Sequence, residues 1–167
     1  SDRGAVQYVP VFFHLVGDNE GKGRVKERQV LDQLCALNAY YAPMDVRFYL
    51  RPHPTHGLFN YGINNVNVYS NQTAWFTMNF ARHQNAINLY IVDEAVSGNN
   101  NPGVTLAYYS PTRDWIVSRR DRINGSMNNN VIQHEVGHFF SLMHTFLGWE
   151  SNPFDSNDTG WPNAPSI

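Results

Sequence analysis

The residues with the clearest chemical potential are three histidines and a glutamate late in the chain. They stand as His134-Glu135-Val136-Gly137-His138, with His144 six residues further on. Residues four apart on an α-helix lie about 40° apart around its axis, so His134 and His138 can both reach one Zn²⁺ ion at about 2.0–2.1 Å. Glu135 points elsewhere and can hydrogen-bond a water held by the metal. The pattern predicts a catalytic zinc site with Glu135 as general base.

A third zinc ligand is needed, because catalytic zinc usually has three protein ligands and one open position. On a continuous helix, His144 would lie roughly 80° away from the face of His134. His144 can therefore join the metal only if the helix ends near Ser141 and the chain turns back. Asp155 is an alternative third ligand. From the frequencies of His and Glu in this chain, the full spacing is expected by chance only about 3 × 10⁻⁴ times.

The elements that must position this site follow from the apolar patterning. Strands are expected where β-branched and aromatic residues concentrate, and helices where apolar residues recur at helical spacing. Residues 51–84 are expected to form a long connection with a strand-like piece at 66–69, and Pro10 indicates an edge or a bulge in the first strand. The expected strands are 5–16, 46–50, 86–93, 104–109 and 115–119, and the expected helices are 25–41 and one that starts after Asn130.

This order predicts an α+β fold, with an α/β-like N-terminal subdomain. We expect a mixed, twisted, five-stranded sheet with two main helices, the second of which carries the zinc motif. The chain has 167 residues, 42% of them hydrophobic, which is about one domain. The chain has a single cysteine, Cys35, which excludes an internal disulfide. We expect Cys35 on the apolar face of the first helix, in the core of the protein.

The charge distribution argues against two classes of partner. The net charge is −2, and neither sign is clustered, whereas a protein that binds nucleic acid would show a basic face. No apolar run approaches the length of a membrane span. Lysine is rare and asparagine abundant, which favours an exported protein, so we expect a secreted location. The sequence begins directly at Ser1 with no signal peptide, and any targeting segment is expected to have been removed.

The zinc motif resembles the signature of the metzincin metallopeptidases, HExxHxxGxxH. The segment HEVGHFFSLMHTF over 134–146 is most similar to the corresponding segment of the pappalysin (cytophagalysin-like) branch of secreted peptidases. The segments VPVFFHLV, NLYIVDE and GVTLAYYSP occur in the same order as in the N-terminal subdomain of that family. The resemblance covers most of residues 5–146, and only the zinc motif is specific.

The resemblance implies a zinc endopeptidase that hydrolyses peptide bonds with metal-activated water. It implies that His134, His138 and His144 are the zinc ligands and that Glu135 is the general base. It further implies that 104–109 is an edge strand that binds an extended peptide by backbone pairing. The residues expected to line this substrate-binding cleft are Leu106, Ala107 and Tyr108.

Two features depart from the family pattern. Ser141 replaces the glycine at the turn, and a left-handed serine costs about 1–2 kcal/mol. No methionine follows Met143 and no tyrosine follows Tyr109, so the methionine turn and the pocket wall beside it are missing. We therefore expect residues 1–147 to be the upper catalytic subdomain and 148–167 to begin an incomplete lower one. A second chain or a C-terminal segment would complete the domain. The alternative is an inactive, zinc-stabilised module for peptide binding or adhesion.

Other candidate ligands are weaker. The oxygen-rich tail around Asp155 and Asp158 could bind Ca²⁺, although it lacks the spacing of an EF-hand and is more typical of a solvated turn. The four remaining histidines are isolated in sequence from cysteines and carboxylates, and we interpret them as strand or loop residues: His14, His53, His56 and His83.

Overall fold

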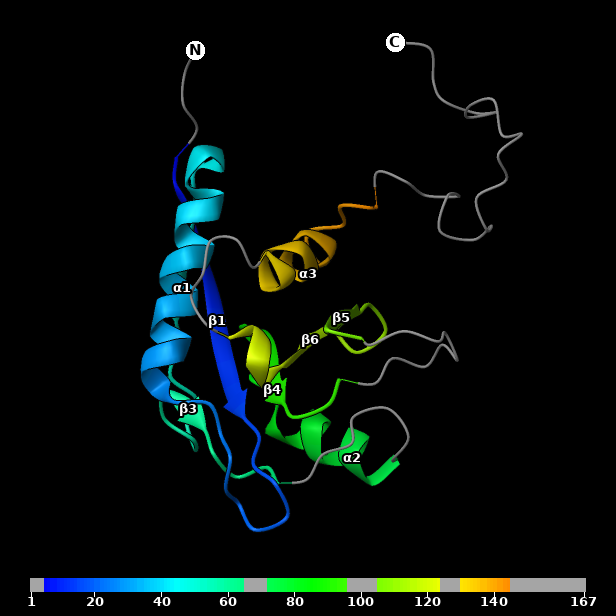
Figure 1. Cartoon of the computed structure of the whole chain (residues 1–167). Helices are drawn as coiled ribbons and strands as arrows, with labels where there is room; N and C mark the ends of the chain where they lie inside the picture. Colours follow the sequence, from blue (N-terminus) through cyan, green and yellow to red (C-terminus); the bar gives the residue numbers. More distant parts are fainter. Residues whose placement is uncertain (1–4, 65–71, 96–104, 124–129, 145–167) are drawn as a thin grey trace, which may run out of the picture.

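The computed structural model describes residues 5–64, 72–95, 105–123 and 130–144. These residues form a mixed six-stranded sheet with helices on both faces (Figure 1). The strand order is β2-β1-β4-β6-β5, and β3 pairs beside β1. The strands are β1 (Gln7–Leu15), β2 (Val46–Leu50), β3 (Phe59–Asn60), β4 (Ile87–Val92), β5 (Ala107–Ser110) and β6 (Trp115–Arg119). The helices are α1 (Glu27–Tyr41), α2 (Gln72–Ala81) and α3 (Val131–Phe139), with 3₁₀ turns at Ala42–Met44 and Arg120–Arg122.

The centre of the sheet is parallel. β1 runs parallel to β2, β3 and β4, and β4 runs parallel to β6. Every residue of β4 is buried, as expected of a strand covered on both faces. β5 is antiparallel to β6 and ends the sheet. Pro10 lies where β1 pairs with β2 alone, because pairing with β4 starts at Val11. The strand thus has a local edge at the proline, which agrees with the sequence-based expectation.

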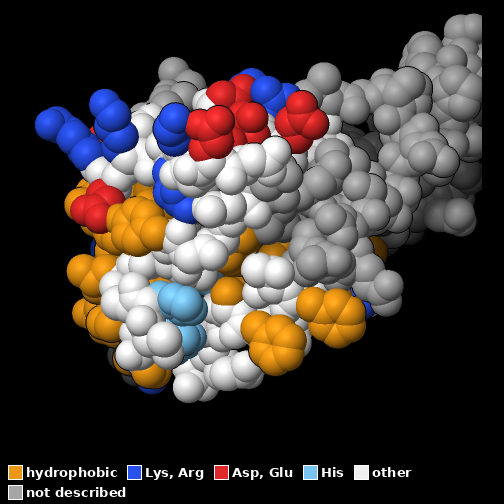
Figure 2. Space-filling view, turned by 90° about the horizontal axis from the view of Figure 1, so that it is seen from below, with side chains coloured by type: hydrophobic (Ala, Val, Ile, Leu, Met, Phe, Trp, Pro, Cys, Tyr) orange, Lys and Arg blue, Asp and Glu red, His pale blue; other side chains and the backbone are white. Residues whose placement is uncertain are grey.

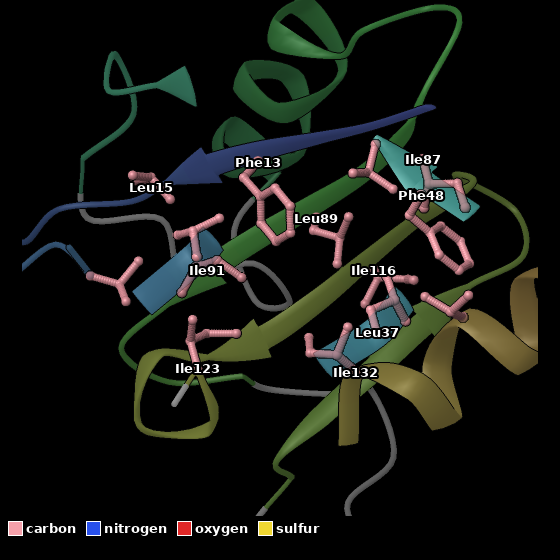
Figure 3. Packing of buried hydrophobic residues seen from close by; sticks show 14 of the residues in the cluster. Phe13, Leu15, Leu37, Phe48, Ile87, Leu89, Ile91, Ile116, Ile123 and Ile132 are labelled. Atoms are coloured by element: carbon pink, nitrogen blue, oxygen red, sulfur yellow. The ribbon is translucent and has the colours of Figure 1, made fainter. Parts of the chain in front are cut away.

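The larger core lies between the sheet and the helices α1 and α3 (Figure 3). Side chains alternate along a strand, so the odd-numbered residues of β1 and β4 share this face. From Val11 of β1 and Ile87 of β4 onward these side chains are almost completely shielded from water, and they meet apolar residues of α1 and α3. Its members include Val11, Phe13, Leu15, Leu37, Ile87, Leu89, Ile91, Ile116, Ile132 and Val136.

Helix α1 begins and ends close to the predicted bounds, but it is rotated from the predicted face. Leu31 is exposed, and so is Cys35, which was expected in the core. Gln33 is fully buried instead, 3.5 Å from Gln133 of α3. The prediction for Cys35 was wrong because the contact with α3 draws the Gln33 side of the helix inward.

The opposite face of the sheet is covered by α2, a helix that the sequence-based prediction missed. Its residues Met78 and Ala81 are buried against Tyr90 and Trp115, whereas Phe80 is 84% exposed. A helix with large apolar residues on both sides has little amphipathic periodicity. For that reason the segment was interpreted as part of a long connection.

The predicted fold class is confirmed, as an α+β fold with a mixed sheet. The described residues contain six strands and three helices, against the predicted five and two, because β3 and α2 were not foreseen. The predicted strand at 66–69 and the segment 148–167 lie outside the described residues, so the division at residue 147 stays a prediction. Among the described residues, no helix is long and apolar enough to cross a membrane.

Candidate metal centre

Helix α3 is held against the sheet by one apolar face. Ile132 and Val136 are fully buried in the larger core. The hydroxyl of Tyr41 donates a 2.8 Å hydrogen bond to the carbonyl oxygen of Gln133, and burial raises the pKa of Tyr41 to about 12. This contact joins the end of α1 to the first turn of α3. The opposite side of α3 carries the histidines toward solvent.

The helix ends as the zinc motif requires. Ser141 has a φ of 66°, the left-handed conformation predicted for it. Its N–H donates to the carbonyl oxygen of His138 at 2.9 Å, and the N–H of Leu142 donates to the carbonyl oxygen of Gly137 at 3.0 Å. These two bonds form a Schellman motif, in which a left-handed residue closes the helix. The chain then turns back and brings His144 over the helix.

The three imidazoles meet at their Nε2 atoms. The distances are 3.0 Å between His134 and His138, 3.0 Å between His134 and His144, and 2.8 Å between His138 and His144. Each Nε2 carries either a proton or a lone pair, so at least two of the three nitrogens are in the same state. Two like groups so close repel each other. A cation shared by three lone pairs removes this repulsion.

The tautomer of His138 is set by a neighbour. The Nδ1 atom of this ring lies 2.7 Å from the carbonyl oxygen of Leu142. A carbonyl oxygen can only accept, so Nδ1 carries the proton and the Nε2 atom presents its lone pair. Such a bond to the far nitrogen also orients a metal-binding imidazole and makes it a stronger ligand. Leu142 occupies this position because of the left-handed turn at Ser141.

The residues present fit a zinc ion. A tetrahedral Zn²⁺ with bonds of about 2.0–2.1 Å to nitrogen holds its ligand atoms roughly 3.3 Å apart. The Nε2 atoms of the three histidines, called the triad below, need to move apart by only a few tenths of an ångström to reach this separation. In the described part of the chain, these histidines form the one group of three or more potential ligands whose ligand atoms all lie within 4.8 Å of one another. Asp155, the alternative third ligand, and Asp158, named for calcium, lie outside the described residues.

Glu135 occupies a different environment from its histidine neighbours. The residue is only 8% exposed, and burial raises the pKa of its carboxyl group. Nearby His138, the backbone of Tyr109 and His144 act in the opposite direction, but the effect of burial on the pKa is larger. A carboxylate in such a place can take up a proton more readily than an exposed one. Sequence reasoning did not foresee the role of Leu142, because it acts through its backbone carbonyl oxygen.

The residues predicted to line a peptide cleft lie on or beside β5. Leu106 immediately precedes the strand, and all three residues are partly exposed. The side chain of Tyr108 packs against the core under α2, while that of Tyr109 packs against the core under α3. Ala107 therefore shares the α3 face with Tyr109. Their role in substrate binding stays a prediction.

The other four histidines are close together in space, although they are far apart in the sequence. The ring centroids of His53 and His56 are 4.7 Å apart, and those of His53 and His83 are 5.4 Å apart. In buried His14, Nε2 donates to Asn88 Oδ1 and Nδ1 accepts from Asn60, each at 3.0 Å.

The surroundings of this cluster contain few acidic groups. Between Asp45 and Asp93 the sequence has no acidic residue. Figure 2 shows histidine side chains exposed among hydrophobic ones, with the acidic side chains toward the upper part of the view.

Because the nitrogens of His14 bond protein groups, the structural interpretation of this histidine holds.

Comparison with known proteins links the chain to metallopeptidases. It is 29% identical to an extracellular metalloprotease of Neurospora crassa, in an alignment that covers 84% of this chain and 51% of the relative. It is 26% identical to an extracellular metalloprotease of Colletotrichum graminicola, over 95% of this chain and 59% of the relative. The chain thus spans between half and three-fifths of the length of these curated relatives. No protein-family model matches the sequence.

The fold also has counterparts among solved structures. Mature mirolysin of Tannerella forsythia, solved with a cleaved peptide, superposes with a TM-score of 0.55 at 16% identity, over 86% of this chain and 66% of that one. A promirolysin variant of the same organism superposes with a TM-score of 0.53 at 16% identity, over 85% of this chain and 58% of that one. At this level of identity the comparison establishes the likeness of the fold.

Proposed function

We propose that this chain is the zinc-binding part of a secreted endopeptidase of the metzincin type, in its pappalysin branch. The observation that carries the proposal is the convergence of three Nε2 atoms, 2.8–3.0 Å apart, beside a buried glutamate. The names of the fungal relatives, extracellular metalloproteases, support both the activity and the location. The motif HEVGHFFSLMHTF supports the choice of branch.

The mechanism divides the work between the triad and Glu135. His134, His138 and His144 would hold zinc, which when bound polarises the scissile carbonyl and makes water more acidic. Glu135 accepts the proton of the attacking water as the new C–O bond forms. It then gives that proton to the leaving nitrogen as the C–N bond breaks. Its partly desolvated carboxyl group suits both steps, because burial has already raised its pKa.

The substrate in this proposal is an extended peptide lying along β5. Among the described residues, that strand ends the sheet, and its outer edge would pair with an added strand. Leu106, Ala107 and Tyr108 would line the cleft, with Ala107 on the side of α3. The cleaved peptide in the mirolysin structure supports a peptide substrate for this fold.

A further segment would complete the catalytic domain, supplied by a C-terminal continuation or a second chain. The end of the described chain is apolar and uncovered, with Phe140 37%, Leu142 59% and Met143 68% exposed. Such residues are normally buried against another part of a domain. The greater length of the relatives supports the same conclusion.

The test is a comparison of Glu135→Ala with Glu94→Ala, a variant of an exposed carboxylate outside the site. Zinc content is measured by mass spectrometry, and peptidase activity with unfolded casein. Glu135→Ala should keep one zinc ion and lose at least about 100-fold in activity, whereas Glu94→Ala should match the wild type. A fully active Glu135→Ala would overturn the mechanism. With the completing segment present, a wild-type protein that binds zinc without any turnover would instead favour the binding or adhesion module.

A further inference from the structure

The four histidines outside the zinc motif form a second cluster, which consists of His14, His53, His56 and His83. The ring of Phe12, which is fully buried, lies among them. Its centroid is 4.9 Å from that of His14, 5.4 Å from that of His53 and 5.6 Å from that of His83. His53 belongs to the 52–57 loop, which is closed by two backbone hydrogen bonds between His53 and Gly57, at 2.8 and 3.1 Å. Through His53, this loop covers part of Phe12.

Two rings of the cluster are held in their neutral form by backbone groups. The N–H of Thr55 donates to Nδ1 of His53 at 3.1 Å. The N–H of Asn85 donates to Nδ1 of His83 at 3.1 Å, and Nε2 of His83 donates to the carbonyl oxygen of Pro52 at 3.1 Å. A backbone N–H can only donate, so each Nδ1 presents a lone pair and the ring proton lies on Nε2. A second proton would make each Nδ1 a donor that faces another donor, and the bond would be lost.

His14 has the same kind of bond in the centre of the sheet. Its Nδ1 accepts a 3.0 Å hydrogen bond from Nδ2 of Asn60, whose Oδ1 accepts from the N–H of Gly62. Its Nε2 donates to Oδ1 of Asn88 at 3.0 Å, and the same oxygen accepts the N–H of His83 at 2.8 Å. Three of the four rings thus accept a hydrogen bond at Nδ1, which only a neutral imidazole can do.

The elements that build the cluster carry no carboxylate to stabilise charged rings. Strands β1, β3 and β4, helix α2 and the 52–57 loop contain no aspartate or glutamate. The charged residues next to the cluster are Arg51, which precedes the loop, and Arg82, which donates to the carbonyl oxygen of Arg113 at 3.0 Å. Tyr90, which stacks on His14, donates its hydroxyl proton to a backbone carbonyl oxygen, and burial raises its pKa. Added protons on the rings therefore find no neutralising partner on these elements.

The electrostatics of the cluster favour neutral rings. Burial, followed by repulsion from His56 and His83, lowers the pKa of His53. Burial is also the largest cause of the low pKa of His14, about 3. The bonds at Nδ1 are therefore complete above pH 6.5, the ordinary pKa of histidine, and each is lost as the pH falls through the lowered pKa of its ring. Because His53 is half-buried and His14 is fully buried, His53 takes up its proton first.

We propose that the second histidine cluster is an acid-operated switch that releases the 52–57 loop from Phe12. Uptake of protons by His53 and His83 breaks their bonds at Nδ1 and places like charges side by side, since the two ring centroids are 5.4 Å apart. Helix α3 packs on the opposite face of the sheet from the cluster and stays in place when the loop is released (Figure 1). The switch is independent of the proposed peptidase activity, and its test needs no substrate.

Amide hydrogen exchange, measured by NMR on the full chain at pH 7.5 and pH 5, tests the release. Each rate is divided by the intrinsic rate at the same pH. The amide of Gly57, which donates to the carbonyl oxygen of His53, should lose at least about fivefold in protection at pH 5. The amide of Leu89, in β4, should stay at least about a hundredfold more protected than that of Gly57. Unchanged protection of Gly57 would overturn the proposal, and so would equal protection of both amides at pH 5, because the whole fold would then open together.

Asparagine in place of histidine separates the charge from the hydrogen bond. Its Oδ1 lies close to the position of Nδ1 and still accepts, but the amide does not titrate. The double variant His53→Asn/His83→Asn should therefore keep the protection of Gly57 at pH 5 within about twofold of its value at pH 7.5. His56→Asn, in the same loop, is the matched control and should still release the loop in acid. Release in the double variant equal to that in the wild type would overturn the role of the two histidines.

A second measurement needs no variant. In the wild type, nuclear Overhauser effects between the rings of Phe12 and His53 should be present at pH 7.5, where the centroids are 5.4 Å apart, and absent at pH 5. Ring contacts that persist at pH 5 would show that the loop remains on Phe12 in acid, and the proposal would be wrong.

Discussion

The Nδ1 atom of His138 donates its proton to the carbonyl oxygen of Leu142, four residues later, at 2.7 Å. This bond couples the end of α3 to the candidate metal centre. It leaves the Nε2 lone pair of His138 for the metal, and it exists only because the chain reverses at Ser141. The turn therefore builds the site in two ways, by returning His144 and by fixing a tautomer.

Replacement of Ser141 tests the energy stored in this turn. Because its φ is 66°, Ser141→Gly should raise the free energy of unfolding by about 1 kcal/mol, and Ser141→Val should lower it by more than that. Thr55→Gly, at a residue without positive φ, is the control and should be neutral or destabilising. Urea unfolding of the metal-free chain measures all three. A Ser141→Gly variant less stable than the wild type would contradict the prediction.

Zinc should stabilise the fold through the triad. Zinc at 100 times its Kd should add about 2.7 kcal/mol to the free energy of unfolding, and a chelator should remove this gain. His138→Ala should abolish the response, and His56→Ala, in the second cluster, should retain it. Thermal unfolding with and without zinc provides the measurement. A retained zinc response in His138→Ala would show that the ion binds elsewhere.

Lowering the pH should decrease the free energy of unfolding because of His14. Burial, with further repulsion from His56, His53 and His83, lowers the pKa of His14 from 6.5 to about 3, against the effect of its bond to Asn88. Between these values the unfolded chain binds a proton that the folded chain does not. Stability is therefore complete above pH 6.5 and falls by about 1.4 kcal/mol per pH unit toward pH 3.

The dependence on His14 can be isolated with one variant. His14→Gln should lower stability at pH 7 but flatten its decline between pH 6.5 and 4. Urea unfolding at a series of pH values measures the slope, which is independent of the starting stability. An unchanged slope in the variant would assign the acid sensitivity to other groups.

Cys35 should react as a surface thiol. Since the residue is exposed on α1, a thiol reagent should label the native protein fully, and Cys35→Ser should leave the melting temperature within about 1 °C of the wild type. Spectrophotometric thiol titration, in buffer and in denaturant, gives the comparison. Labelling that appears only in denaturant would place the side chain in the core.

Many of the strands and helices could be predicted from the sequence because they depend on local patterns of residues. The strands 46–50 and 115–119 were predicted with the bounds of β2 and β6. Their dense β-branched and aromatic residues are bounded by turn residues. Helix α2 could not be predicted, because some of its apolar residues lie in the core and others lie on the surface. Cys35 was wrongly expected in the core, because the side of α1 that carries Gln33 packs toward Gln133 of α3 instead.

The sequence by itself predicted the candidate metal site. Four-residue spacing brings His134 and His138 to one side of a helix, and the position of His144 demands a break near Ser141. These relations act within one or two helical turns. Only the tertiary structure decided that Gln33 meets Gln133 and that His14 bonds Asn88, a residue 74 positions away. Such contacts depend on which strands become neighbours in the sheet, and the burial energy that selects those neighbours belongs to the whole chain rather than to any local pattern.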